Sequence, residues 1–213
     1  LEFLVELKTP AIKLASGDIK SLPFIRKVAN TGLPVIMSTG GATMHDIELA
    51  ISHVDPEQCA LLQCTAAYPA EAELMDLRVI QTFREAFPST VIGLSSHDKG
   101  ILFPVIAATL GARVIEKHFT DNTSRIGPDH GFSLDPHKWK EMVDATRILE
   151  RSLGDGVKRI EENEIDARIV QRRAYRYLRD IEAGHVISEA DLIPLRPCPS
   201  DGVTPFQLDM VIN

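Results

Sequence analysis

The stretch VIGLSSHDKGILFPVIAATLGARVIEKH, residues 91–118, decides the fold of this chain. Two short apolar runs, 91–95 and 113–118, have the composition of strands, and a helix-like segment, 101–110, lies between them. Both runs are apolar on both faces, which is typical of strands buried in a parallel sheet. The stretch therefore predicts a βαβ unit with a right-handed crossover.

The same alternation of strand and helix signals continues upstream. We expect strands at 11–16, 34–39 and 59–65 and helices at 22–29, 44–53 and 77–87. Five βα units in series predict an α/β fold. Polar residues follow each of the five strands, which suggests that every strand contributes to a site. A doubly wound sheet would instead bind its ligand at a single crevice between strands. We therefore expect a partial (β/α)₈ TIM barrel, made of the last five of its units, with about three strands missing upstream.

The barrel portion is expected to occupy residues 1–155. Its last helix has Asp135 as a cap and Pro136 at its first position, and glycines end it near residue 155. Residues 156–170 are rich in charge and predict a solvated helical linker.

Residues 171–213 predict a small β-rich module with tight turns. Its strand-like segments are 175–178 and 180–187. The module is cut off at Asn213, and the chain opens as if inside an amphipathic helix, 1–7. We therefore expect the chain to be a piece of a longer protein.

Charge and cysteine content narrow the function classes. The 30 acidic and 23 basic residues give a net charge of −7, which argues against nucleic acid or an anionic membrane as the main partner. No apolar run is long enough for a membrane span. Cys59, Cys64 and Cys198 fit no disulfide framework, and a reduced cytoplasmic protein is the simplest interpretation.

Two histidines end the strand-like runs of residues 91–118. Side chains alternate along a strand, so Ser95 shares a face with His97, and Glu116 shares a face with His118. Imidazole is a common ligand of borderline metals, and a nearby carboxylate can orient it or join it. The two pairs predict a divalent-metal site. The alternative is that each histidine only forms a hydrogen bond in the core.

Six ordered motifs resemble the sialic acid synthase family, that is, N-acetylneuraminate synthase and its bacterial nonulosonate relatives. They are KLASGD (13–18), VIMSTG (35–40), QCTAAYP (63–69), IGLSSH (92–97), EKHFT (116–120) and GPDH (127–130). The tail, from Asp180 to Pro197, resembles the start of the family's C-terminal antifreeze-like (SAF) domain.

The resemblance implies an enzyme that condenses phosphoenolpyruvate with the open-chain form of an N-acylated amino sugar. The products are a nine-carbon α-keto acid and phosphate. A divalent ion, Mn²⁺ or Mg²⁺, would be held by His97 and His118 and would polarise the sugar aldehyde. Glu116, on the face of His118, would orient a ligand or the sugar, with a surface carboxylate as the alternative.

The resemblance also assigns substrate-binding residues. Lys13, Ser16, Ser38 and Ser95 match phosphoenolpyruvate-binding positions, and one cation with three hydroxyls suits an anion. Tyr68 and Asp129 match sugar-binding positions. Taken singly, each serine could be a turn former, and Asp129 could be a turn carboxylate after Pro128.

Arg196 matches an arginine that reaches into the barrel of the partner subunit and holds the N-acyl group of the sugar. The resemblance thus implies a domain-swapped homodimer in which Arg196 lies far from the histidines of its own chain. The alternative is a solvated arginine beside two prolines.

Some residues depart from the family pattern. Ala66 stands where many relatives have Ser or Asn, Ser96 replaces an acidic residue or Gly, and Gly41 replaces a common Met. The family's general-base Glu lies on the strands expected upstream, so we expect this chain alone to be inactive. A metal-dependent TIM-barrel hydrolase and a non-catalytic carbohydrate-binding homologue remain as alternatives.

Overall fold

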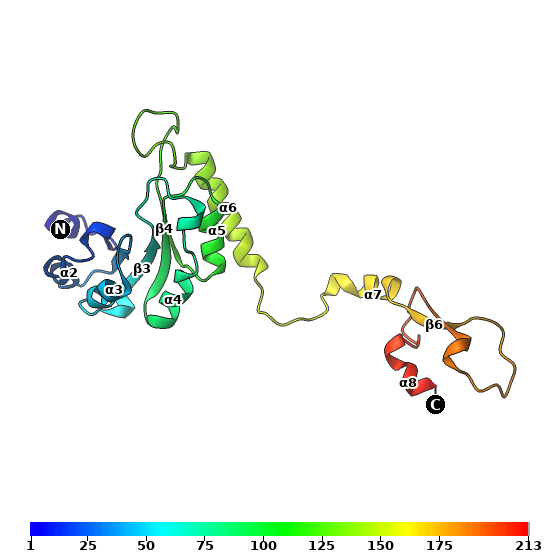
Figure 1. Cartoon of the computed structure of the whole chain (residues 1–213). Coiled ribbons are helices and arrows are strands. Elements are labelled where there is room, and N and C mark those ends of the chain that lie inside the picture. The colour runs from blue at the N-terminus through cyan, green and yellow to red at the C-terminus, as the bar shows by residue number, and fades with distance from the viewer. Residues whose placement is uncertain (213) are drawn as a thin grey trace. The chain divides into compact units, whose positions relative to one another are not determined.

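The computed structural model describes residues 1–212, which form two units (Figure 1). The first unit, residues 1–154, contains a parallel sheet with strand order β1-β2-β3-β4-β5. The strands are β1 (Ile12–Leu14), β2 (Val35–Ser38), β3 (Cys59–Cys64), β4 (Val91–Ser96) and β5 (Val114–Lys117). The helices are α1 (Glu2–Glu6), α2 (Leu22–Ala29), α3 (Met44–Ile51), α4 (Val79–Ala86), α5 (Leu102–Thr109) and α6 (Pro136–Ser152). Short 3₁₀ turns cover Ser16–Asp18, Pro56–Gln58 and Ala72–Leu74.

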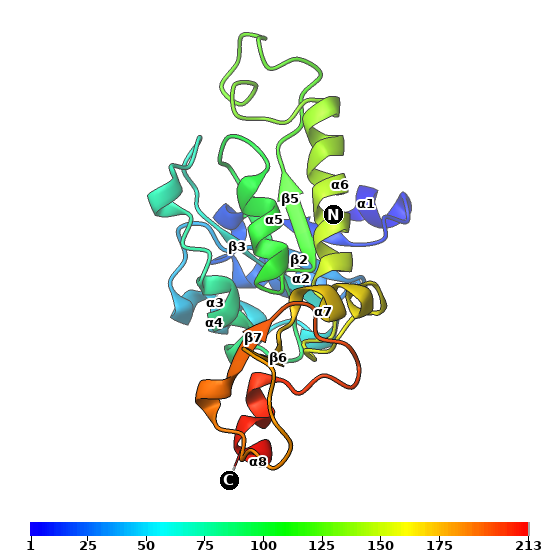
Figure 2. The same cartoon turned by 90° about the vertical axis from the view of Figure 1, so that its right-hand side faces the viewer.

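The predicted series of βα units is confirmed. Each expected strand appears, and a helix lies between each strand and the next, within a few residues of its predicted ends. Asp135 caps α6 as expected, since its Oδ1 accepts a hydrogen bond of 2.8 Å from the backbone N of Lys138. Helices α5 and α6 lie side by side along the sheet (Figure 2).

The hydrophobic core lies between the sheet and its helices. Alternate strand residues, such as Met37, Leu61 and Leu94, are at most 1% exposed and pack against helix residues such as Ile25 and Ile80. The residues between them on the strands face the other side of the sheet. Polar residues can therefore occupy that inner side without interrupting the core.

The sheet is curled. Lys13 lies on β1 and Glu116 on β5, at the two edges of the sheet, yet Lys13 Nζ is 3.3 Å from Glu116 Oε2. In a flat sheet these strands would be roughly 19 Å apart, because neighbouring strands are separated by about 4.8 Å. The curvature is that of a half-barrel, with Lys13 and Glu116 on its inner face.

Gly93 is required where β4 lies close to β3 and β5. A Cβ atom at this position of β4 would collide with the carbonyl oxygen of Val114 on β5 and with the side chain of Leu62 on β3. Only a residue without a side chain allows the three strands to approach in this way.

The second unit begins at Asp155. It contains α7 (Ile165–Gln171), an antiparallel pair of β6 (Ala174–Tyr177) and β7 (Leu192–Leu195), and α8 (Leu208–Val211). The 3₁₀ turns are Glu162–Glu164, Glu189–Asp191 and Pro205–Gln207.

Two expectations for the second unit were wrong in detail. Residues 180–187 form no strand, and the partner of β6 is β7 instead. Asp191 explains this, because its carboxylate binds Arg179, His185 and Ser188 and so folds the intervening segment into a loop. The linker is helical only from Glu162, where a capping box between Glu161 and Glu164 begins the 3₁₀ turn that leads into α7 at Ile165.

No helix among residues 1–212 combines the length and the apolar character that crossing a bilayer requires.

Candidate active site

The predicted polar residues of the first unit lie at the carboxyl ends of the parallel strands. Ser38 ends β2, Ser95 is near the end of β4, Glu116 is near the end of β5, and His97 and His118 follow β4 and β5 directly. Carboxyl ends of parallel strands meet at one edge of a sheet, so strands far apart in sequence contribute to one place. This set of strand-end residues is the candidate site.

Glu116 is the centre of a chain of polar contacts. Ser95, its register partner on β4, donates from Oγ to Glu116 Oε1 at 2.8 Å. Lys13 Nζ lies 3.3 Å from Glu116 Oε2 and also donates to the carbonyl oxygen of Leu14 at 2.8 Å. The side chains of Lys13 and Glu116 are 32% and 40% exposed, so a ligand can reach both.

The two histidines face each other. Their ring centroids are 5.2 Å apart, and their planes are inclined by 77°. His97 Nδ1 lies 2.8 Å from the carbonyl oxygen of Thr65. A carbonyl can only accept, so Nδ1 carries the proton, and in the neutral imidazole Nε2 keeps its lone pair. His118 Nδ1 is 3.8 Å from Asp129 Oδ2.

This arrangement fits an open metal position. A backbone carbonyl that fixes the tautomer of a histidine is the usual support of a metal-binding imidazole. Within residues 1–212, no group of three or more His, Cys, Asp or Glu side chains is placed to hold an ion. Two imidazoles by themselves would leave most of the coordination sphere to substrate and water, whereas a structural site is closed by protein ligands.

The two histidines differ in proton affinity. Burial works against protonation of His97, but the Cys64 thiol and the Thr65 carbonyl outweigh it and leave the pKa of His97 raised. Burial, together with the charge of His97, lowers the pKa of His118. Opposite shifts in two neighbouring imidazoles are expected when the charge of one disfavours the charge of the other.

Two aromatic side chains, Tyr68 and Phe132, pack beside the histidine pair. The ring of Tyr68 lies 4.1 Å from that of His97 and 6.0 Å from that of His118, between centroids. Phe132 is 5.0 Å from the ring of His118. Tyr68 is 54% exposed, and so is the side chain of Asp129. Both predicted sugar-binding residues therefore reach solvent beside the histidines.

Ser38 and Ser16, two of the predicted anion-binding serines, have different surroundings. Ser38 is 3% exposed, and its Oγ has no hydrogen-bond partner within the described part of the chain. A buried hydroxyl without a partner is uncommon and costs free energy unless a ligand or water satisfies it. Ser16 Oγ accepts from the backbone N of Gly40 at 2.9 Å and lies 3.5 Å from Cys64 Sγ.

Arg196 belongs to the second unit. It follows β7 directly and is exposed. Its role in a partner's barrel stays a prediction.

Several contacts of the site were not predicted from the sequence. Cys64 and Thr65 contact His97, and Phe132 contacts His118. Strand alternation places Cys64 on the inner face and could have identified it. Phe132 and the Thr65 carbonyl carry no such signal, because loop geometry positions them.

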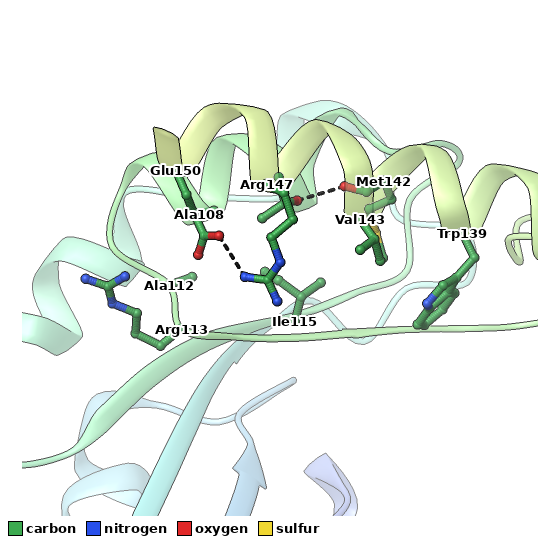
Figure 3. A pocket seen from close by; sticks show the side chains of 10 residues that line it. Ala108, Ala112, Arg113, Ile115, Trp139, Met142, Val143, Arg147 and Glu150 are labelled. Atoms are coloured by element: carbon green, nitrogen blue, oxygen red, sulfur yellow. Dashed lines mark hydrogen bonds and ion pairs between the residues drawn. The ribbon is translucent and has the colours of Figure 1, made fainter. Parts of the chain in front are cut away.

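A separate pocket lies on the helix side of the sheet (Figure 3). It has a volume of about 240 Å³ and is lined by α5, β5 and α6. Trp139, Met142 and Val143 supply its apolar side, and Arg147 Nη1 donates to Glu150 Oε2, one turn along α6, at 2.7 Å. None of the strand-end residues described above lines it.

A curled parallel sheet with polar side chains at its carboxyl end places this chain in the class of (β/α)-barrel proteins. The model of the NeuB family matches residues 1–158, and the chain belongs to this family. The resemblance to the sialic acid synthases and their bacterial relatives is thus confirmed.

Three similar proteins illustrate the family. N,N'-diacetyllegionaminic acid synthase of Legionella pneumophila is 37% identical over 220 residues, which cover 100% of this chain and 61% of that protein. Human N-acetylneuraminate-9-phosphate synthase is 39% identical over 163 residues, which cover 75% of this chain and 45% of the human protein. A crystal structure of N-acetylneuraminic acid synthetase from Leptospira borgpetersenii, in complex with citrate, matches with a TM-score of 0.71 and 32% identity. The match covers 78% of this chain and 59% of the Leptospira chain. The chain therefore spans about three fifths of the Legionella relative.

Proposed function

We propose that this chain is the major part of a nonulosonic acid synthase that uses phosphoenolpyruvate. The enol carbon of phosphoenolpyruvate forms a bond with the aldehyde carbon of an N-acylated amino sugar. Water adds at the carbon that bears the phosphate, and inorganic phosphate leaves. The observation that carries the proposal is the pair of facing imidazoles beside the Lys13, Glu116 and Ser95 chain, in a member of the NeuB family.

Phosphoenolpyruvate binds on the Lys13 side of the site. Lys13 supplies the positive charge, and the Ser38 hydroxyl is buried without a partner and ready to donate. Ser95 and Ser16 add hydroxyls at the neighbouring strand ends. Glu116 holds the Lys13 ammonium in place from the opposite edge of the sheet and orients the sugar or a ligand of the metal.

His97 and His118 would hold a divalent cation, Mn²⁺ or Mg²⁺. The cation, when bound, acts as a Lewis acid on the sugar aldehyde. His97 presents Nε2, since its Nδ1 donates to Thr65. Tyr68 and Asp129 stand beside the pair and hydrogen-bond the sugar hydroxyls.

The second unit is proposed to be the start of an SAF domain. In a domain-swapped homodimer its Arg196 would complete the site of the partner subunit. We further propose a cytoplasmic location, which the free Cys59, Cys64 and Cys198 support because disulfides are rare in a reducing compartment.

The test is phosphate release by the natural full-length protein with phosphoenolpyruvate, Mn²⁺ and a panel of sugars. The panel contains N-acetylmannosamine and its bacterial deoxy, diamino analogues, because relatives make neuraminic, legionaminic and pseudaminic acids. We expect release that depends on one of the sugars. Sugar-independent hydrolysis would favour a barrel hydrolase, and sugar binding without turnover would favour a carbohydrate-binding homologue.

Lys13→Met is expected to weaken phosphoenolpyruvate binding far more than sugar binding. A charge-assisted hydrogen bond to a dianion is worth about 1.5–3 kcal/mol, or roughly 10- to 150-fold in affinity. Isothermal titration with each substrate measures the two effects separately. Lys140→Met, on the exposed surface of α6, is the matched control and should change neither affinity. Impaired sugar binding with unchanged phosphoenolpyruvate affinity would reverse the assignment of the subsites.

A further inference from the structure

A buried lysine and a buried aspartate lie immediately behind the two histidines. Lys117 Nζ is 2.6 Å from Asp98 Oδ1, and the two side chains are 0% and 2% exposed. Lys117 Nζ also donates to the carbonyl oxygen of Asp98, and Ser96 Oγ donates to Asp98 Oδ1. Burial of both charges is costly, and such a pair is better evidence of a specific geometry than of stability.

Sequence neighbours connect this pair to the site. Asp98 follows His97, and Lys117 precedes His118. Because side chains alternate along a strand, Lys117 is directed to the helix side of the sheet, while Glu116 and His118 are directed to the inner side. The buried pair therefore contacts no ligand in the half-barrel.

The backbone pairing of β4 and β5 ends just before the histidines. The last paired residues are Ser96 and Lys117, so His97 and His118 each lie one residue beyond. The carbonyl oxygen of His97 accepts from Ala70 N at 3.0 Å, and that of His118 accepts from Leu134 N at 2.9 Å. Each histidine is thus tied to a different loop. The Lys117–Asp98 pair therefore connects the two chain segments at the point where the backbone pairing of β4 and β5 has ended.

We propose that Asp98 and Lys117 are positioning residues, which fix the separation of His97 and His118 and so set the affinity of the site for a divalent cation. The proposal rests on the proposed function, because it takes the two imidazoles as the ligands. A site with two protein ligands is sensitive to their spacing, since displacements of about 0.5 Å already disturb a constellation of this kind.

The test is the double variant Asp98→Asn/Lys117→Met in the natural full-length protein. It removes both charges at nearly constant volume, so no unpaired charge stays buried, and we expect the variant to fold. We expect Mn²⁺ affinity to fall about 10-fold or more, the range found when groups that support metal ligands are lost. Mn²⁺ titration followed by electron paramagnetic resonance measures the affinity, and thermal unfolding without metal measures the stability.

Lys138→Met/Glu141→Gln is the matched control. Its lysine and carboxylate are 2.7 Å apart on the exposed surface of α6, and its Mn²⁺ affinity should equal that of the wild type. Ser96→Ala is a milder second variant that removes one hydrogen bond to Asp98. It should weaken Mn²⁺ binding about 2- to 10-fold.

Wild-type Mn²⁺ affinity in the folded double variant would overturn the positioning role and leave the proposed function intact. If the double variant does not fold, wild-type affinity in Ser96→Ala overturns it in the same way. A wild-type protein that binds no Mn²⁺ would overturn the metal site itself, and the positioning role with it.

Discussion

Replacing His97 or His118 by alanine is expected to abolish metal-dependent phosphate release in the natural full-length protein. Each imidazole is one of two proposed protein ligands, so either change removes half of the protein's contribution to the site. Loss of groups that merely support metal ligands already costs about 10- to 100-fold in affinity or activity. We therefore expect a loss of at least about 100-fold in both Mn²⁺ affinity and phosphate release.

His137→Ala is the control for this pair of variants. His137 is exposed near the start of α6 and takes part in none of the site contacts described above, so its removal should leave Mn²⁺ affinity unchanged. Thermal unfolding in the absence of metal checks that the His97 and His118 variants fold. Full activity of His97→Ala in the presence of Mn²⁺ would contradict the assignment of His97 as a metal ligand.

Mixing two inactive full-length variants, Arg196→Ala and His97→Ala, is expected to restore activity. In a domain-swapped dimer, the intact barrel of the Arg196→Ala chain would receive Arg196 from the His97→Ala chain. One of the two sites in each mixed dimer is then complete. Random pairing gives about one quarter of the wild-type activity, because half of the dimers are mixed and each has one working site.

A second mixture controls for this complementation. Arg196→Ala combined with the double variant His97→Ala/Arg196→Ala contains no complete site and should stay inactive. Arg172→Ala, another exposed arginine of the second unit, should be active by itself. If the first mixture stays inactive after subunit exchange has been demonstrated, Arg196 has no role across subunits.

Local patterns were sufficient to predict the parallel sheet. The strands are short apolar runs in the sequence because both of their faces are buried. Helices cover one face, as at Leu94, and the neighbouring strands crowd the inner face, as at Gly93. Strand alternation also placed Ser95 with His97 and Glu116 with His118 on the inner face. The structure brings these four residues together as expected.

Contacts between distant segments could not be predicted in this way. The approach of Lys13 to Glu116 depends on the curvature of the whole sheet, which no local window contains. The hydrogen bond of His97 to Thr65 depends on a backbone carbonyl, and every residue type has one. In the second unit, the segment 180–187 was predicted to be a strand, but the polar contacts of Asp191 decide the local structure.

The crowding at Gly93 limits how natural selection or protein engineering can change this protein. Any side chain at residue 93 would collide with the Val114 backbone and the Leu62 side chain, and both belong to neighbouring strands of the same ladder. A shift that relieved one collision would break backbone pairing on the other side. Substitutions are easier to accommodate in the loops after the strands, where the side chains of Tyr68 and Asp129 are more than half exposed and belong to no strand of the sheet.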